Sequence, residues 1–178
     1  NTPVPTATST PIPMPAMSGT EGYFEYWLEN GTVTITAFTG SDLAEVVVPD
    51  EIQGYPVTGI GELAFWECGS LRNITIPNGI INIENSAFLG CYNLRSIIIP
   101  NSVISIGNSV FSECYNLSSI TMPDSIISIG EYAFWKCTKL KTINLSKSLT
   151  DMGNGVFCGC DGLESIEIPK SLNTVGTD

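Results

Sequence analysis

The sequence contains no histidine, and it has only 7 Lys and Arg against 18 Asp and Glu. Histidine is the commonest general base and metal ligand, so its absence removes the usual catalytic and metal-binding chemistry. Serine is abundant but has no partner base to activate it. The acidic residues are scattered and form no pair at matching positions of the predicted strand face. We therefore expect a protein that is not an enzyme and that uses no cofactor and no metal.

The shortage of basic residues gives a net charge of −11. Nucleic acids and anionic membrane surfaces both attract clustered positive charge, so the sequence predicts no nucleic-acid partner. There is no run of 18 apolar residues and no signal peptide, so no membrane insertion is expected. The acidic excess instead favours solubility in a chain that is 43% hydrophobic.

Residues 1–19 are rich in Pro and Thr, with five prolines in the first 15 residues. Proline at this density favours extended polyproline II and cannot join a core. We interpret the segment as a semi-rigid linker; a ragged terminus without a role is the alternative. Linkers of this kind resemble those between modules of secreted proteins, so we expect the chain to be part of a larger multi-modular protein.

Residues 20–42 carry the signature of a β-hairpin. Two stretches of strand-forming residues, 24–28 and 33–37, flank Asn30 and Gly31. This dipeptide supplies the positive φ angles of a two-residue turn, and alternating apolar residues give one buried face. Because a repeat array exposes an apolar end, we expect this hairpin to be an N-terminal cap.

Residues 43–178 are an internal repeat. From Ala64 onward the pattern recurs every 23 residues without insertion or deletion, giving five repeats. One divergent unit precedes them over about residues 43–63, and its five extra residues predict a small loop near Gly54. The recurring positions include Phe65, Phe88, Phe111, Phe134 and Phe157; Cys68, Cys91, Cys114, Cys137 and Cys160; and Ile74, Ile97, Ile120, Ile143 and Ile166.

Each repeat predicts three local structures. The segment x-Ile-x-Ile-Pro alternates and indicates a short strand that the proline ends. Ser-Ile-x-x-Ile-Gly predicts a second short strand, and Gly-x-x-Ala-Phe-x-x-Cys predicts one or two helical turns.

The array either stops at Asp178 without a cap or continues beyond it, and a missing cap would leave Phe157, Ile166 and Ile168 exposed.

The repeat unit AFxxCxxLxxIxIPxSIxxIGxx resembles the BspA-like leucine-rich repeat, also called leucine-rich repeat type 5, over roughly residues 22–178. Small departures are Ser146 in place of Pro and Glu84 in place of Gly. The resemblance implies a repeat solenoid: a right-handed leucine-rich-repeat horseshoe with a parallel β-sheet, short second strands and short helical turns. It also implies a bacterial extracellular protein. Some members of the family are similar to adhesins that bind host matrix proteins.

From this resemblance and the missing catalytic residues we expect an adhesion or binding module, secreted or on the cell surface. Its partner would be an extracellular protein or polysaccharide. The alternative is a structural spacer that presents a neighbouring domain. The outward strand positions are the candidate ligand-binding residues, with a merely solvated sheet face as the other interpretation. They are Asn73, Thr75, Ser96, Ile98, Ser119, Thr121, Thr142, Asn144, Ser165 and Glu167.

Three further features stand out in the repeats. The five repeated cysteines are expected as buried free thiols, because parallel inward Cβ vectors fit disulfide geometry poorly. Exposed aromatic residues are typical of binding hot spots, although packing between coils explains them equally well. Ile81, Ile104 and Ile127 would form a partly exposed apolar stripe, which is a candidate contact surface.

Overall fold

The computed structural model describes residues 16–177, and this part of the chain contains strands and turns but no helix. Most of the expected linker, residues 1–15, lies outside the described residues. The N-terminal strands are β1 (Met17–Glu21), β2 (Phe24–Glu29), β3 (Thr32–Phe38), β4 (Glu45–Val47), β5 (Glu51–Ile52) and β6 (Tyr55–Ile60). The repeats contribute β7 (Asn73–Thr75), β8 (Asn82–Ile83), β9 (Ser96–Ile98), β10 (Ser105–Ile106), β11 (Ser119–Thr121), β12 (Ser128–Ile129), β13 (Thr142–Ile143), β14 (Asp151–Met152), β15 (Ser165–Ile166) and β16 (Thr174–Val175).

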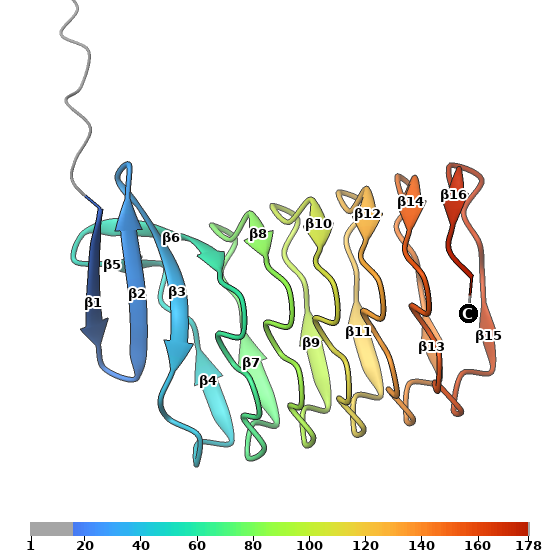
Figure 1. Cartoon of the computed structure of the whole chain (residues 1–178), viewed down its shortest axis with the longest axis horizontal. Coiled ribbons are helices and arrows are strands. Elements are labelled where there is room, and N and C mark those ends of the chain that lie inside the picture. The colour runs from blue at the N-terminus through green and yellow to red at the C-terminus, as the bar shows by residue number, and fades with distance from the viewer. Residues whose placement is uncertain (1–15, 178) are drawn as a thin grey trace, which may run out of the picture.

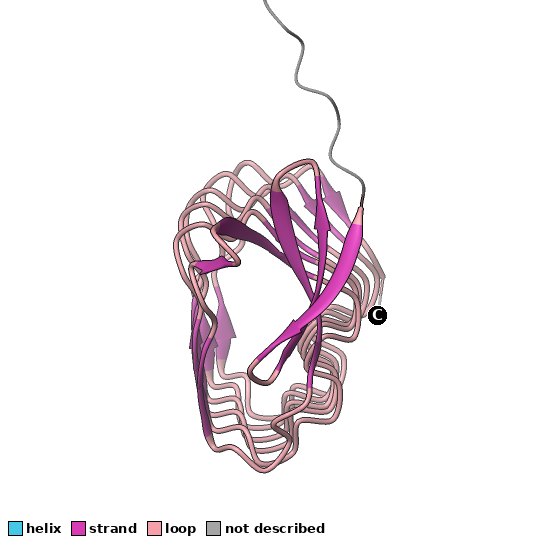
Figure 2. Ribbon diagram, turned by 90° about the vertical axis from the view of Figure 1, so that its left-hand side faces the viewer, coloured by secondary structure: helices cyan, strands magenta, loops and turns pink. Residues whose placement is uncertain are grey.

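The strands build a β-solenoid whose coils stand side by side along the long axis of the molecule (Figure 1). The first strand of each coil joins one parallel ladder, in the order β4–β7–β9–β11, which the pair β13–β15 continues in the last coils. The second strand of each coil joins the sheet β1–β2–β3–β6–β8–β10–β12–β14–β16, with β5 on β6. Viewed along the axis, the strands lie on two sides of the coil (Figure 2). The parallel solenoid and both strands of each repeat are therefore confirmed.

The expected hairpin at the head of the array is present. β2 and β3 are antiparallel, and Asn30 and Gly31 between them have φ angles of 53° and 78°. Both angles are positive, as the tight two-residue turn requires. β3 then pairs in parallel with β6, and the Phe38 ring stacks on Phe65 at 5.1 Å. The hairpin thus covers the N-terminal end of the coil stack.

The structure differs from the expected boundary between residues 19 and 20. β1 begins at Met17 and pairs antiparallel with β2 along its whole length, from Met17 opposite Leu28 to Glu21 opposite Phe24. Strand pairing therefore reaches back into the expected linker, because β2 has an open edge that a neighbouring extended segment can satisfy. Similarly, the small loop expected near Gly54 is a second hairpin, in which β5 and β6 are paired.

The segment that precedes each cysteine forms consecutive turns in place of the expected helical turns. Within one coil, Ala64 N donates to Gly61 O and Cys68 N to Phe65 O, whereas Phe65 N donates to Ala87 O of the next coil at 2.8 Å. An α-helix would direct every N–H to the fourth residue before it. Two positions of each turn segment also have positive φ, which interrupts a helix. They are Leu63, Ser86, Ser109, Tyr132 and Gly155, and Glu67, Gly90, Glu113, Lys136 and Gly159.

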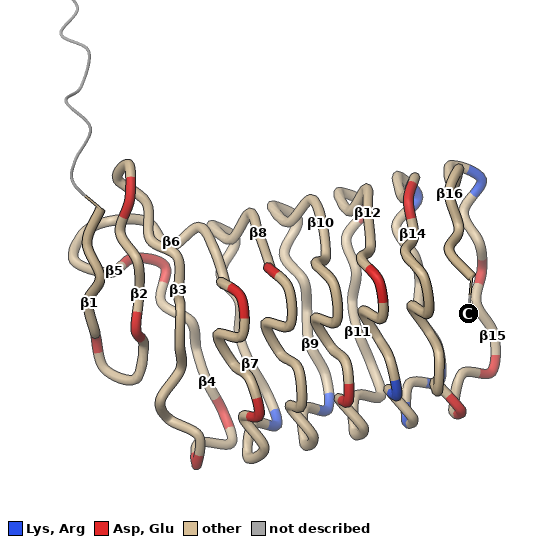
Figure 3. Tube along the Cα trace, in the orientation of Figure 1, with Lys and Arg blue, Asp and Glu red and all other residues tan. Residues whose placement is uncertain are grey.

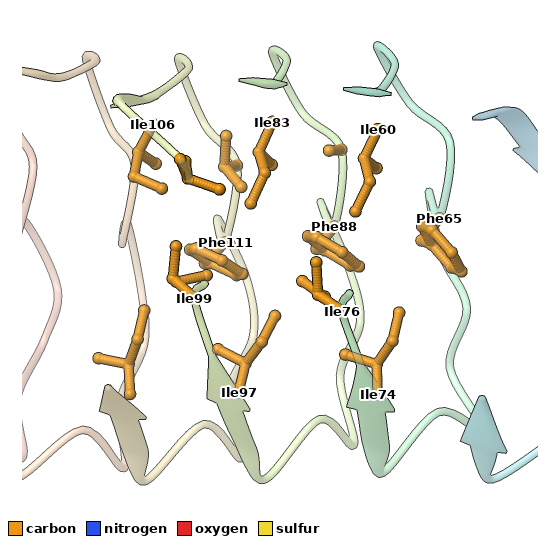
Figure 4. Close-up of a cluster of buried hydrophobic side chains, with 14 of the residues drawn as sticks. Ile60, Phe65, Ile74, Ile76, Ile83, Phe88, Ile97, Ile99, Ile106 and Phe111 are labelled. Carbon is orange, nitrogen blue, oxygen red and sulfur yellow. The ribbon is translucent and has the colours of Figure 1, made fainter. Parts of the chain in front are cut away.

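The core is a set of columns of identical or similar side chains between the two strand ladders (Figure 4). Phe65, Phe88, Phe111 and Phe134 are completely buried. Neighbouring rings in this column are 5.0–5.6 Å apart, with interplanar angles between 5° and 19°. Each coil therefore buries its apolar face only against its neighbours, so stability accrues between coils.

The last coil is less covered than the others. Phe157 and Ile166 are partly buried, whereas the corresponding Phe134 and Ile143 are 0% and 3% exposed. Ile168 is 52% exposed. This increase in exposure follows from the absence of a covering coil after β16 in the described residues.

The part of the chain that the structure describes holds no helix able to cross a membrane.

Candidate functional site

The strand face is formed by the outward positions of the first ladder. The ladder's register places Asn73 opposite Ser96, Ser96 opposite Ser119, and Ile98 opposite Thr121. β13 and β15 repeat this arrangement, with Thr142 opposite Ser165. All ten predicted ligand-binding residues are exposed on this face in two columns. The structure thus brings the ten positions together as the period-2 pattern implies, while their role in binding stays a prediction.

Two residues that belong to the same face were missed. Glu45 pairs with Asn73 and Val47 with Thr75, so β4 extends both columns by one coil. Val47 is 69% exposed and resembles Ile98, which is 68% exposed. The sequence does carry a signal for them: Val46, Val48 and Pro49 match the Ile-x-Ile-Pro segment of the repeat, and this match places the residues on either side of Val46 on the face.

Most polar side chains of the strand face make no hydrogen bond to another part of the described chain. Among residues 16–177, only Asn73 of the ten uses its side chain in a hydrogen bond, a 3.4 Å contact to Glu45 Oε1. Serines elsewhere in the coils are engaged: Ser125 Oγ donates to Val103 O at 2.6 Å and Ser171 Oγ to Leu149 O at 2.7 Å. The face therefore presents hydroxyl and amide groups whose donors and acceptors only water satisfies.

A groove adjoins the C-terminal end of the strand face. It has a volume of about 600 Å³ and lies where the strands give way to the proline turns. Asn144 and Glu167 of the predicted set line it together with Lys147 and Lys170. Carboxylate and ammonium groups therefore lie together at this end of the face.

The turn edge of the solenoid carries exposed aromatic side chains. Trp66 is 53% exposed and Tyr132 is 45% exposed, while Tyr92 and Tyr115 stack on each other at 5.6 Å. A shallow hollow of about 510 Å³ lies on this edge between coils. Its lining combines aromatic and apolar groups with hydroxyls, and consists of Ser86, Leu89, Ser109, Ser112, Tyr132 and Trp135.

The isoleucine stripe is exposed as the sequence predicts. Ile81, Ile104 and Ile127 are 42%, 46% and 46% exposed. They lie in register, because Ile81 N donates to Thr58 O and Ile127 N to Ile104 O. The stripe is short, since Thr58 and Thr150 occupy the same position in the flanking coils.

The repeated cysteines form a buried ladder of free thiols. Four of the five thiols donate to the carbonyl of the phenylalanine one coil earlier, as Cys91 Sγ does to Phe65 O at 3.1 Å and Cys114 Sγ to Phe88 O at 3.3 Å. Burial raises the pKa of Cys68 from 9.0 to about 11, and burial also raises the pKa of Cys114. The protonated thiol is thus the form that the fold favours, and the ladder is structural, because nucleophilic or metal-binding cysteine requires the thiolate.

We expect iodoacetamide to alkylate one thiol per folded chain at mildly alkaline pH, and all six after unfolding. The single reactive group is Cys158, which is exposed. Mass spectrometry counts the labels, and Cys158→Ser should yield none. Labelling of a second thiol in the folded protein would contradict the ladder.

Folding raises the pKa of the Cys68 thiol from 9.0 to about 11. The contribution of the protonated Cys68 thiol to the free energy of unfolding is therefore present below pH 9 and is lost as the pH rises through about 11.

Metal-ligating clusters and unpaired buried polar groups are two features by which a reactive site can be recognised. No group of three or more His, Cys, Asp or Glu is placed to hold a metal ion within residues 16–177. The buried polar side chains of this part of the chain all have hydrogen-bond partners, so none is left directed at a ligand. The groups exposed on the strand face and the turn edge are hydroxyl, amide, aromatic and charged side chains.

Comparison with known sequences and structures identifies similar proteins. The family described as the BspA type leucine rich repeat region matches residues 58–178 in six copies. No curated protein matches the chain. A leucine-rich repeat protein of T. pallidum is 28% identical with a TM-score of 0.63, and the match covers 80% of this chain and 89% of that one.

Two further solved structures extend beyond the matched region. A leucine-rich repeat protein from Bacteroides ovatus is 31% identical with a TM-score of 0.76, covering 91% of this chain and 42% of that one. A leucine rich cell surface protein from Faecalibacterium prausnitzii is 25% identical with a TM-score of 0.52, covering 90% and 55% respectively. This chain therefore spans about half the length of these two proteins.

Proposed function

Because this chain belongs to the BspA-type leucine-rich repeat family, we propose that it is an extracellular binding module of a secreted or cell-surface bacterial protein. Its ligand is an extracellular protein or polysaccharide that lies on the strand face. The similar F. prausnitzii protein is described as a cell surface protein, which supports the location. From the family we also infer right-handed coils and a horseshoe curvature, and a module that acts without catalysis, cofactor or metal.

The observation that carries this proposal is the free hydrogen-bonding capacity of the strand face. Of the nine polar outward side chains, eight make no hydrogen bond within residues 16–177, and the tenth residue, Ile98, is apolar. Rigid strands hold these groups in fixed columns, so a ligand that engages several at once loses little conformational entropy in the protein. A flat, pre-organised array of short polar groups is suited to a long ligand that makes many weak contacts.

We expect the combined variant Thr75→Ala, Thr121→Ala and Asn144→Ala to weaken retention on arrays of matrix proteins and polysaccharides by about thirtyfold, at roughly 0.7 kcal/mol for each hydrogen bond lost. The matched control is Thr36→Ala, Thr174→Ala and Asn173→Ala, which alters exposed residues of the same types outside the strand face and its groove. The control should bind as the unaltered protein does. Equal losses in both variants would contradict a binding role for the face.

A structural spacer is the second candidate function. The uninterrupted phenylalanine column, from Phe38 to Phe157, and the backbone bonds between all coils favour a stiff body. Such a body would hold a neighbouring module at a fixed distance. If the folded chain binds nothing on the arrays, the result favours the spacer function and the binding proposal fails.

A further inference from the structure

The few basic residues of this acidic protein are concentrated beside the strand face. Arg72, Arg95 and Lys141 share one repeat position, immediately before the outward column, and Lys139 lies in the adjacent column. These four residues, called the cationic strip below, are all exposed and include four of the seven basic residues. Figure 3 shows the blue positions along the lower edge of the solenoid, near the strands β7, β9 and β11.

The strip is held in register by the backbone. Arg95 N donates to Arg72 O at 3.0 Å, and Ser118 N donates to Arg95 O at 3.0 Å. Consecutive coils are about 4.8 Å apart along such a ladder, so the strip extends about 14 Å from Arg72 to Lys141. The cations therefore line up parallel to the solenoid axis and beside the free hydroxyls of the face.

The outward columns between Arg72 and Lys141 contain no acidic residue, although Glu67 and Glu113 lie on the adjacent turns. Glu45 lies before this stretch and Glu164 and Glu167 lie after it, although the chain has 18 acidic residues in all. The remaining outward positions between these limits are neutral. They are Ser70, Asn73, Thr75, Asn93, Ser96, Ile98, Asn116, Ser118, Ser119, Thr121, Thr142 and Asn144.

Within residues 16–177, the charges of the strip have no carboxylate partner. The ion pairs within residues 16–177 use other lysines, namely Lys136 with Glu113 and Lys147 with Asp124. Lys139 Nζ donates to Asn116 Oδ1 at 2.6 Å, a neutral acceptor. Glu45 and Glu164 each lie one coil beyond an end of the strip and reduce the positive field there. Acidic residues farther than about 8 Å are largely screened at physiological ionic strength, so the middle of the strip, around Arg95, keeps a local positive field despite the net charge of −11. The strip is thus free to attract an anion.

We propose that the cationic strip and the neighbouring hydroxyl columns bind an anionic polysaccharide, a linear glycan with sulfate or carboxylate groups that lies along the solenoid axis. The inference rests on the proposed binding role of the strand face and names the ligand class for it. Guanidinium groups bind such oxyanions in a bidentate manner, and the free hydroxyls and amides suit sugar hydroxyls. An acidic peptide fits less well, because an added strand needs an open sheet edge and β7 and β9 are paired on both sides.

The test compares two variants with the same change in charge. Arg72→Gln with Arg95→Gln removes two positive charges from the strip, and Thr36→Glu with Thr174→Glu adds two negative charges at exposed positions outside the strip and the groove. Binding of each to immobilised dextran sulfate, alginate and unmodified dextran is measured over a range of salt concentrations. We expect the unaltered protein to bind a charged polymer but not dextran. The strip variant should lose about thirtyfold in affinity with a shallower salt dependence, and the control variant should lose much less.

Each outcome decides the inference. Dextran sulfate and alginate distinguish a sulfate from a carboxylate ligand, and binding to either supports it. Equal losses in the two variants, or no binding to either charged polymer, overturn it. Tighter binding to polyglutamate than to both anionic polysaccharides, with the same strip dependence, assigns an acidic peptide and also overturns it. If the unaltered protein binds neither charged polymer, but both it and the strip variant bind a neutral glycan or a matrix protein that the Thr75, Thr121 and Asn144 variant does not, the binding role stands and only the anionic ligand class fails.

Discussion

Replacing Phe111 by alanine lowers the free energy of unfolding by about 4 kcal/mol. The Phe111 side chain is completely buried, and its ring stacks between Phe88 at 5.6 Å and Phe134 at 5.4 Å. The substitution removes both contacts and leaves a cavity in the middle of the array. Because each coil is stabilised only by its neighbours, the loss also weakens the coupling between the two halves of the solenoid. Chemical denaturation followed by circular dichroism should show an earlier and broader transition.

The control for this substitution is Phe157→Ala in the last coil. Phe157 is only partly buried and stacks on one neighbour, Phe134, at 5.6 Å. We therefore expect roughly half the loss, about 2 kcal/mol, with little change in the breadth of the transition. Equal losses at the two positions would mean that stability does not depend on stacking between coils.

Replacing Gly130 by alanine should cost about 3 kcal/mol although it adds only one methyl group. Gly130 follows β12, and a Cβ atom there would lie 2.6 Å from Asn108 N and 2.6 Å from Gly107 C of the preceding coil. These are backbone atoms of a paired coil, so the coil spacing itself would have to open. The hydrogen bond from Gly130 N to Ile106 O, now 2.9 Å, would be strained as well. Thermal unfolding measures the loss.

Gly69→Ala is the matched control for this second substitution. A Cβ atom at Gly69 would meet Tyr92 at 3.6 Å, an ordinary van der Waals contact. We expect a change of less than about 1 kcal/mol there. If both alanine variants are equally stable, the close approach of the coils at Gly130 is not what requires glycine.

The repeat made much of this structure predictable. Equal spacing of Phe, Cys and Ile fixed which side chains stack, and alternation around Ile74 and Ile97 fixed which residues point outward. The Asn30-Gly31 turn was predictable because it is a local signal that few other conformations accommodate. The ten strand-face residues were found for the same reason, since a period of two leaves only one choice of face.

The turn segments were not predictable in this way. Leu63, Tyr132 and Lys136 adopt positive φ, which costs such residues roughly 1 kcal/mol each and is a conformation that local propensity argues against. Bonds such as Glu67 N to Leu89 O at 2.8 Å connect coils 22 residues apart and offset this cost. A local interpretation of Ala-Phe-x-x-Cys therefore favours helical turns that the stacked coils replace.

The sequence by itself determined the solenoid, its parallel ladders and its columns of identical core residues, because a strict repeat requires each coil to have equivalent contacts. Only the tertiary structure decided the hydrogen bonding of the turns, the extra strand β1, and the exposure of Arg72, Arg95, Lys139 and Lys141 without a carboxylate partner among residues 16–177, although the repeat already aligns these residues. Composition had suggested a protein without clustered positive charge. Stacking placed residues 23 positions apart about 4.8 Å from one another, and so converted a few scattered cations into a strip.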